Sequence, residues 1–241
     1  MPDNFYGKSY RIFRTITRLF YPRYQPENAD QEAHSIVYVS HHERFRGPLS
    51  IMLWTKKPIH IWALSVFCEQ QTCCRQIIQY PFVQRFGWNK KAALIICLPL
   101  SYIISALVRS ANAIPVYRGS REIVKTFRQS VDALVKGDNV LIFPDVHYDN
   151  RSALIGEIDP GFLHLEKYYY KKTKKHLVFV PVFASKSQQK IVHGNPVTFQ
   201  DGVDFKIEQE RVKEALRSSL TQLAYKCGDG LTSNCRKDVA K

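Results

Sequence analysis

Short apolar runs typical of strands alternate with amphipathic segments typical of helices between residues 35 and 225. The strand-type runs are 35–40, 59–66, 113–117, 140–143, 177–183 and 190–193, and the helical segments are 122–136, 161–171 and 209–225. This alternation predicts an α/β layered domain with a mostly parallel central sheet flanked by helices. With 45% hydrophobic residues, the chain has enough apolar surface to form such a core.

The first 30 residues are basic and amphipathic. Apolar residues recur at helical spacing, and arginines fall on the other faces: Ile12, Phe13, Ile16, Leu19 and Phe20 against Arg11, Arg14 and Arg18. Two interpretations stay open, a helix packed on the domain and a basic helix lying on an anionic bilayer. We expect three parts: an N-terminal basic amphipathic segment at 1–30, a folded domain at 31–226 and a flexible tail at 227–241.

The stretch at 92–108 (AALIICLPLSYIISALV) carries no charge and is bracketed by Lys90, Lys91 and Arg109. It lies in what we expect to be an apolar helical insertion at about 69–110. Its 17 residues are at the lower limit for crossing a bilayer, and Pro99 interrupts them. Three interpretations compete: a buried core helix, a monotopic helix that enters one leaflet, and a transmembrane span, which fits least well.

Basic residues are in large excess, with 35 lysines and arginines against 21 acidic residues and a formal net charge of +14. A charge of this size predicts attraction to an anionic partner, which could be a phosphate, an acidic lipid surface or an acidic protein. The six cysteines form no CxxC pair and match no zinc spacing with histidines. Arginines interrupt residues 10–24, so this segment does not have the pattern of a secretory signal. We expect a reduced protein that faces the cytosol.

Polar clusters follow three of the predicted strands. His41 and His42 come after the run at 35–40, the sequence RGSR at 118–121 comes after 113–117, and DVHYDNRS at 145–152 comes after 140–143. In open α/β sheets, ligands bind beyond the carboxyl ends of the strands. We therefore expect these clusters to contribute to one ligand site.

The order of these motifs resembles the glycerolipid acyltransferase family, typified by lysophosphatidic acid acyltransferases. Residues 41–48 (HHERFRGP) correspond to the family motif NHxxxxDP, and 114–121 (IPVYRGSR) to its apolar strand ending in a basic turn. Residues 143–148 (FPDVHY) with 150–152 (NRS) correspond to FPEGTRS. Further similar features are Gly161-Phe162, Val180-Pro181-Val182 and Gly194-Asn195-Pro196. The resemblance covers roughly residues 35–197 and implies a glycerol-phosphate acyltransferase-like fold.

The resemblance also implies a role for each polar cluster. His42 aligns with the family's general base, which takes the proton of an acceptor hydroxyl as that hydroxyl attacks a thioester. Arg118 and Arg121 would hold the acceptor's phosphate, and the third motif would contribute through Asp145 and Arg151. The donor would be acyl-coenzyme A or acyl carrier protein, acting as a co-substrate, and neither a metal nor a redox cofactor is implied.

The aspartate of the family's first motif is replaced by Gly47. In the family that carboxylate fixes the imidazole tautomer and stabilises the cation that forms. Glu43 could replace it if the turn folds back, and Asp145 or Asp149 could do so from a neighbouring loop. His41 is an alternative base, although the fifth residue after it is an arginine.

Together these features predict an acyltransferase that moves an acyl group from an acyl thioester to a lysophospholipid-like phosphorylated hydroxyl acceptor. The candidate catalytic residues are His42, Glu43 and Asp145. The protein would be peripheral or monotopic on the cytoplasmic face of a membrane, with anionic lipid, the acyl donor and acyl carrier protein as partners. The missing aspartate motivates an alternative, a catalytically silent lipid- or acyl-binding relative. Nucleic-acid binding is a lesser alternative, because it is supported by basic charge without a recognition motif.

Overall fold

The fold is described by a computed structural model that covers residues 5–27, 35–79, 89–147 and 152–230. The chain forms two compact units. Unit 1 comprises residues 1–19 and 60–126, and unit 2 comprises residues 20–59 and 127–241. This division differs from the three parts expected from the sequence, because the N-terminal segment groups with the chain after residue 60.

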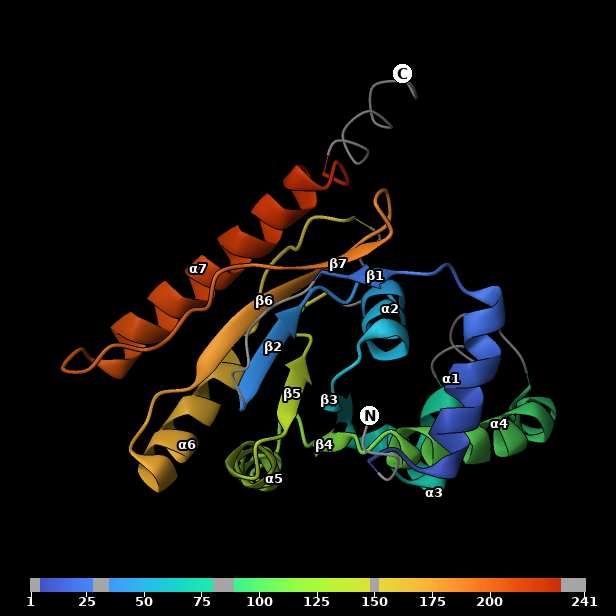
Figure 1. The fold of residues 1–241 in the computed structure, drawn as a ribbon. Helices are drawn as coiled ribbons and strands as arrows, with labels where there is room; N and C mark the ends of the chain where they lie inside the picture. Colours follow the sequence, from blue (N-terminus) through green and yellow to red (C-terminus); the bar gives the residue numbers. More distant parts are fainter. Residues whose placement is uncertain (1–4, 28–34, 80–88, 148–151, 231–241) are drawn as a thin grey trace, which may run out of the picture. The chain divides into compact units, whose positions relative to one another are not determined.

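Unit 2 is built on strands in the order β1-β7-β6-β2-β5 (Figure 1). They are β1 (Gln25–Pro26), β2 (Ile36–Ser40), β5 (Asn139–Ile142), β6 (Val178–Ser185) and β7 (Lys190–His193). The described pairs are parallel, except that β6 and β7 are antiparallel. The mostly parallel α/β arrangement predicted from the sequence is therefore confirmed for this unit.

The central strands of unit 2 are apolar runs because helices and neighbouring strands cover both of their faces. Every residue of β2 and of β5 is buried, as are seven of the eight residues of β6. In register, Val39 of β2 lies beside Ile142 of β5 and beside Pro181 of β6. β2 and β5 therefore end at the same edge, and the residues that follow them meet there, whereas β6 continues to Ser185, beyond the partner of Ser40.

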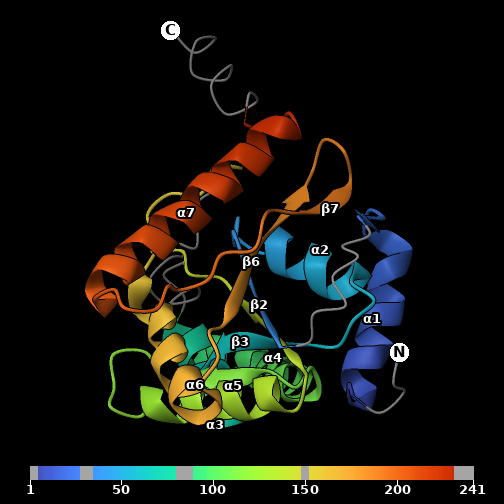
Figure 2. The same cartoon turned by 60° about the vertical axis from the view of Figure 1, so that its left-hand side comes forward.

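The helices of unit 2 are α2 (Arg46–Trp54), α6 (Leu165–Thr173) after the short η3 (Pro160–His164), and α7 (Phe205–Lys226). α5 (Ile123–Val135) begins in unit 1 and ends in unit 2. α2 and α7 lie on opposite sides of β6 and β2 (Figures 1 and 2). α7 starts four residues earlier than the sequence pattern indicated, because the Asp204 side chain caps it by accepting a hydrogen bond of 2.9 Å from the Lys206 amide.

Residues 227–230, which we expected to belong to a flexible tail, are packed in the structure. Cys227 and Asp229 are buried, and the Asp229 carboxylate accepts hydrogen bonds of 3.0 Å from the amides of Lys186 and Ser187. The carboxylate thus holds the turn between β6 and β7. The rest of the predicted tail, residues 231–241, lies outside the described residues.

Unit 1 contains η1 (Ser65–Phe67), α3 (Gln70–Ile77), α4 (Lys90–Ser110) and β4 (Ile114–Val116). It also contains α1 (Lys8–Phe20) and β3 (Ile59–Leu64) except for Phe20 and Ile59, which belong to unit 2. β3 and β4 are parallel, with Trp62 beside Ile114. β3 was expected to be a buried strand, but its residues after Ile59 are only half-buried or exposed. The start of α1 is joined to the end of α4, because the Gly7 amide donates to the Ser110 carbonyl at 2.8 Å and the Tyr10 amide to the Ser110 hydroxyl at 2.8 Å.

α4 contains the uncharged stretch singled out in the sequence, with Pro99 inside the helix. One side of α4 packs on α3 in a cluster formed by Cys73, Cys74, Ile77, Ala93 and Cys97. Other apolar side chains of α4 are exposed, including Ile95 and Ile103. The window Ala93–Ser110 is long and apolar enough to cross a membrane, and 22% of it is buried. The described part of α4 is therefore buried on one side only, which is less than the interpretation as a buried core helix expects.

α1 turns its apolar stripe outward. Tyr10 and Arg14 are its buried residues, whereas Ile12, Ile16 and Leu19 are exposed, the last to 76%. The predicted helix is therefore confirmed, but the face that packs on unit 1 is the one carrying tyrosine and arginine.

Candidate active site

The turn that joins β2 to α2 carries both histidines of the first motif. Two consecutive residues of this turn, Glu43 and Arg44, have positive φ angles of 40° and 59°. Non-glycine residues in this region store strain of about 1 kcal/mol or more each, and such strain is concentrated at functional sites. The tight reversal brings the first turn of α2 back onto the end of β2, where the Gly47 amide donates to the His42 carbonyl at 3.3 Å.

Gly47 makes this close approach possible. A Cβ atom at position 47 would lie 2.1 Å from the His41 carbonyl oxygen and 3.2 Å from the His42 carbonyl oxygen. No side chain fits there without movement of the backbone. The aspartate expected from the family motif is therefore sterically excluded from this turn.

Asp145 takes a central position in the site. It follows β5 and contacts both residues that follow β2: its Oδ1 is hydrogen-bonded to His41 Nδ1, and its Oδ2 accepts the backbone amide of His42 at 2.8 Å. The second ring nitrogen of His41, Nε2, is hydrogen-bonded to the Ser152 carbonyl oxygen at 2.8 Å. The pair is enclosed, with 2% of the His41 side chain and 4% of the Asp145 side chain exposed.

These partners fix the protonation state of His41. A carbonyl oxygen can only accept, so Nε2 carries a proton, and the facing carboxylate favours a proton on Nδ1 as well. Burial by itself lowers the pKa of His41, but the hydrogen bond and charge of Asp145, with the Ser152 carbonyl, outweigh it and raise the pKa above its usual value. The site therefore favours the protonated form of His41, and because both ring nitrogens are hydrogen-bonded, His41 offers no free lone pair for general base catalysis.

The pKa of His42 is shifted in the opposite direction from that of His41, below its usual value. The His42 ring is half-buried between Phe143, in an edge-on arrangement with centroids 5.5 Å apart, and Phe45, at 5.8 Å. Burial is the main cause that lowers the pKa of His42; the charge of Asp145 acts against it and the charge of His41 adds to it. At neutral pH the His42 ring is therefore uncharged and has a lone pair with which to accept a proton.

The other carboxylate proposed for the site is engaged elsewhere. Glu43 pairs with Arg46, one turn further along the chain, and burial raises the pKa of Glu43. It therefore closes the turn between β2 and α2. Asp145 is the carboxylate that is brought to the histidines, and it holds His42 through its backbone rather than through the ring.

The structure describes two of the three predicted phosphate-binding residues. Arg118 and Arg121 are exposed on the turn after β4, around Gly119, which has a φ of 70°. They belong to unit 1, whereas the histidines and Asp145 belong to unit 2, so their convergence on one pocket stays a prediction. Arg151 lies outside the described residues. Among the described residues, no group of three or more His, Cys, Asp or Glu side chains could hold a metal ion.

Sequence reasoning missed two features of this site. The Ser152 carbonyl that fixes His41 is a backbone group and leaves no signal in the sequence. The steric role of Gly47 had a signal, since a glycine in place of a functional aspartate can indicate close backbone approach. In comparisons with known proteins, no family model, no curated protein and no solved structure matches the chain.

Proposed function

We propose that the protein transfers an acyl group from an acyl thioester to a phosphorylated hydroxyl acceptor at a membrane surface, with His42 as the general base. One observation carries the proposal: the half-buried His42, whose pKa is lowered by burial, is held through its backbone amide at the carboxyl edge of a parallel sheet, beside the buried His41–Asp145 pair. Ligand sites in such folds occur at this edge. The motif order in the sequence supports the same assignment.

The chemistry requires one proton acceptor. The acceptor hydroxyl oxygen attacks the thioester carbonyl carbon while His42 takes the hydroxyl proton, and collapse of the tetrahedral intermediate expels the thiolate, which takes the proton back from His42. Asp145 and His41 are positioning residues in this scheme. Asp145 fixes the His42 backbone, and the His41 cation favours the neutral form of the His42 ring.

The test is thiol release from acyl-coenzyme A in the presence of lysophosphatidate, glycerol 3-phosphate or another acceptor of this class. We expect turnover with the wild-type protein and a loss of about 100-fold or more in His42→Ala, the usual contribution of a general base. His60→Ala is the matched control, because this histidine belongs to unit 1 and bonds the Asn112 carbonyl there. Absence of turnover from folded wild-type protein across the acceptor panel would refute the proposal.

A second candidate is favoured by the geometry at position 47. The backbone excludes a carboxylate there, and Asp145 contacts the backbone of His42. Such a site is also compatible with a lipid- or acyl-binding relative that no longer catalyses transfer. In that case acyl thioesters or lysophospholipids would bind without release of thiol, and His42→Ala would not alter the result.

The membrane part of the proposal rests on α1. Its stripe of Ile12, Ile16 and Leu19 is exposed, and Arg11 is exposed beside it. An exposed apolar stripe next to cationic side chains is typical of helices that lie in the interface of an anionic bilayer.

Sedimentation with phosphatidylserine-containing vesicles tests this role. We expect Ile16→Glu to weaken binding about tenfold, because burial of one isoleucine side chain contributes about 1.5 kcal/mol or more. Ser218→Glu, at an exposed position of α7, makes the same change in charge and is expected to bind more tightly than Ile16→Glu. Equal binding of the two variants would contradict the role of α1.

A further inference from the structure

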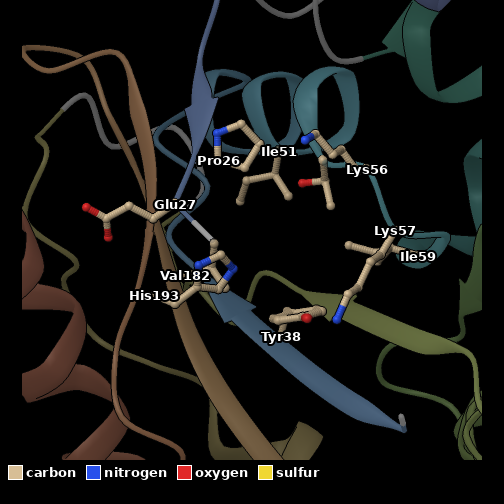
Figure 3. A pocket seen from close by; sticks show the side chains of 10 residues that line it. Pro26, Glu27, Tyr38, Ile51, Lys56, Lys57, Ile59, Val182 and His193 are labelled. Carbon is tan, nitrogen blue, oxygen red and sulfur yellow. The ribbon is translucent and has the colours of Figure 1, made fainter. Parts of the chain in front are cut away.

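Unit 2 contains a cavity that the proposed mechanism does not use. Its volume is about 130 Å³, and residues of α2, β1, β2, β6 and β7 line it (Figure 3). Aliphatic side chains form much of the wall, among them Pro26, Ile51, Ile59 and Val182. A cavity of roughly this size holds a benzene-sized group, so it suits the end of a slender aliphatic chain rather than a bulky ring system.

Polar groups lie among these aliphatic walls. His193 and Tyr38 line the cavity with their rings 5.9 Å apart. His193 Nδ1 is buried and has no hydrogen-bond partner among the described residues. Burial lowers the pKa of His193, Glu27 acts against this and Lys57 adds to it, so the ring is neutral. His193 therefore adds no charge to the wall of the cavity.

The charge at the cavity is cationic. Lys56 and Lys57 line it and are exposed, so their ammonium groups can reach a head group in water. The lining also includes the carboxylate of Glu27, which points away from both lysines in Figure 3. Aliphatic walls with two ammonium groups match a molecule that has one apolar chain and one anionic head.

The cavity adjoins the strand edge that carries the candidate base. Val182 is the register partner of Ser40, two residues before His42, and of His193 on β7. We propose that this cavity binds the aliphatic chain of a single-chain anionic lipid, with its head group at Lys56 and Lys57. The inference deepens the proposed function, on which its choice of a lipid rests. The chain can come from a fatty acid or from a lysophospholipid.

Calorimetric titration of the full chain with hexanoate and, separately, with hexanoyl lysophosphatidate tests the proposal, because a chain of about six carbons matches the cavity volume. We expect saturable binding of at least one probe. Binding of hexanoate alone would identify a fatty-acid site, and binding of the lysolipid a site for the acceptor's chain. The double variant Lys56→Gln/Lys57→Gln should bind about tenfold more weakly, as expected for loss of charge-assisted hydrogen bonds.

Two further variants make the test specific. Lys171→Gln removes one charge from an exposed position of α6 and should bind as the wild type does. Thr55→Phe adds a ring at the cavity wall and should weaken binding of the chain. Failure of the folded wild type to bind either probe would overturn the inference, as would equal affinities of the lysine double variant and Lys171→Gln. Binding without thiol release would overturn acyl transfer and leave the cavity assignment standing.

Discussion

Replacement of Gly47 by alanine should destabilise the protein even though it adds a single methyl group. The new Cβ would lie 2.1 Å from the His41 carbonyl oxygen, and a carbon–oxygen contact normally needs about 3.3 Å, so the backbone must move by about 1.2 Å. Overpacking costs about 3 kcal/mol when a backbone must yield, at the upper end of its usual range. Alanine regains about 1 kcal/mol by restricting the unfolded chain. We therefore expect a net loss of about 2 kcal/mol.

Urea unfolding of Gly47→Ala measures this loss, and Gly156→Ala is the matched control. A Cβ at position 156 meets no atom within 4 Å, so that variant should be as stable as the wild type or more stable by about 0.5 kcal/mol. Gly47→Asp, which introduces the aspartate of the motif that the sequence resembles, should be less stable than the wild type and should not gain activity. If Gly47→Ala unfolds at the wild-type urea concentration while Gly156→Ala behaves as expected, the steric argument fails.

Two predictions concern histidine–carboxylate pairs. Asp145→Asn should lower the free energy of unfolding by about 3 kcal/mol, because it removes the charge that compensates the buried His41 cation; equal urea midpoints for variant and wild type would contradict the ion pair. Burial lowers the pKa of His176, but its bonds to Glu166 and Asp201, of 2.6 and 3.0 Å, outweigh this and raise the pKa. The stabilisation from His176 should therefore be fully present below the histidine's unfolded pKa and be lost as pH rises through the higher folded pKa. Urea midpoints of wild type and His176→Gln should converge at high pH, and a constant difference between them would refute this.

The sequence predicted the layered architecture because β2, β5 and β6 are short apolar runs bounded by turn residues. This pattern is typical of strands that are buried on both faces of a parallel sheet. The sequence also predicted that the residues after β2 and β5 would lie together, since parallel neighbours end at one edge of the sheet. It could not show which of the two histidine rings is hydrogen-bonded to the Asp145 carboxylate. Adjacent residues after a strand point in different directions, and the bonds of Asp145 to the His41 ring and the His42 amide follow from that local geometry.

The packed face of α1 and the packing of residues 227–230 could not be predicted from the sequence, because both depend on contacts between distant parts of the chain. The amphipathic pattern of α1 fits a helix packed through its apolar stripe as well as one that exposes it. The outcome depends on Tyr10 and Arg14, which are the buried residues on the other face. Likewise, nothing in residues 227–230 indicated packing, because Asp229 binds backbone amides about 40 positions away in the chain.

The dependence of kcat/KM for thiol release on pH tests most directly that His42 is the base. Its lowered pKa predicts that kcat/KM rises with pH through an apparent pKa below 6.5, the usual value for histidine, and then stays level as the ring remains neutral. An acid limb that lies above this value would assign the titration to a group such as His41, whose pKa is raised. That result would contradict the assignment of His42 as the proton acceptor.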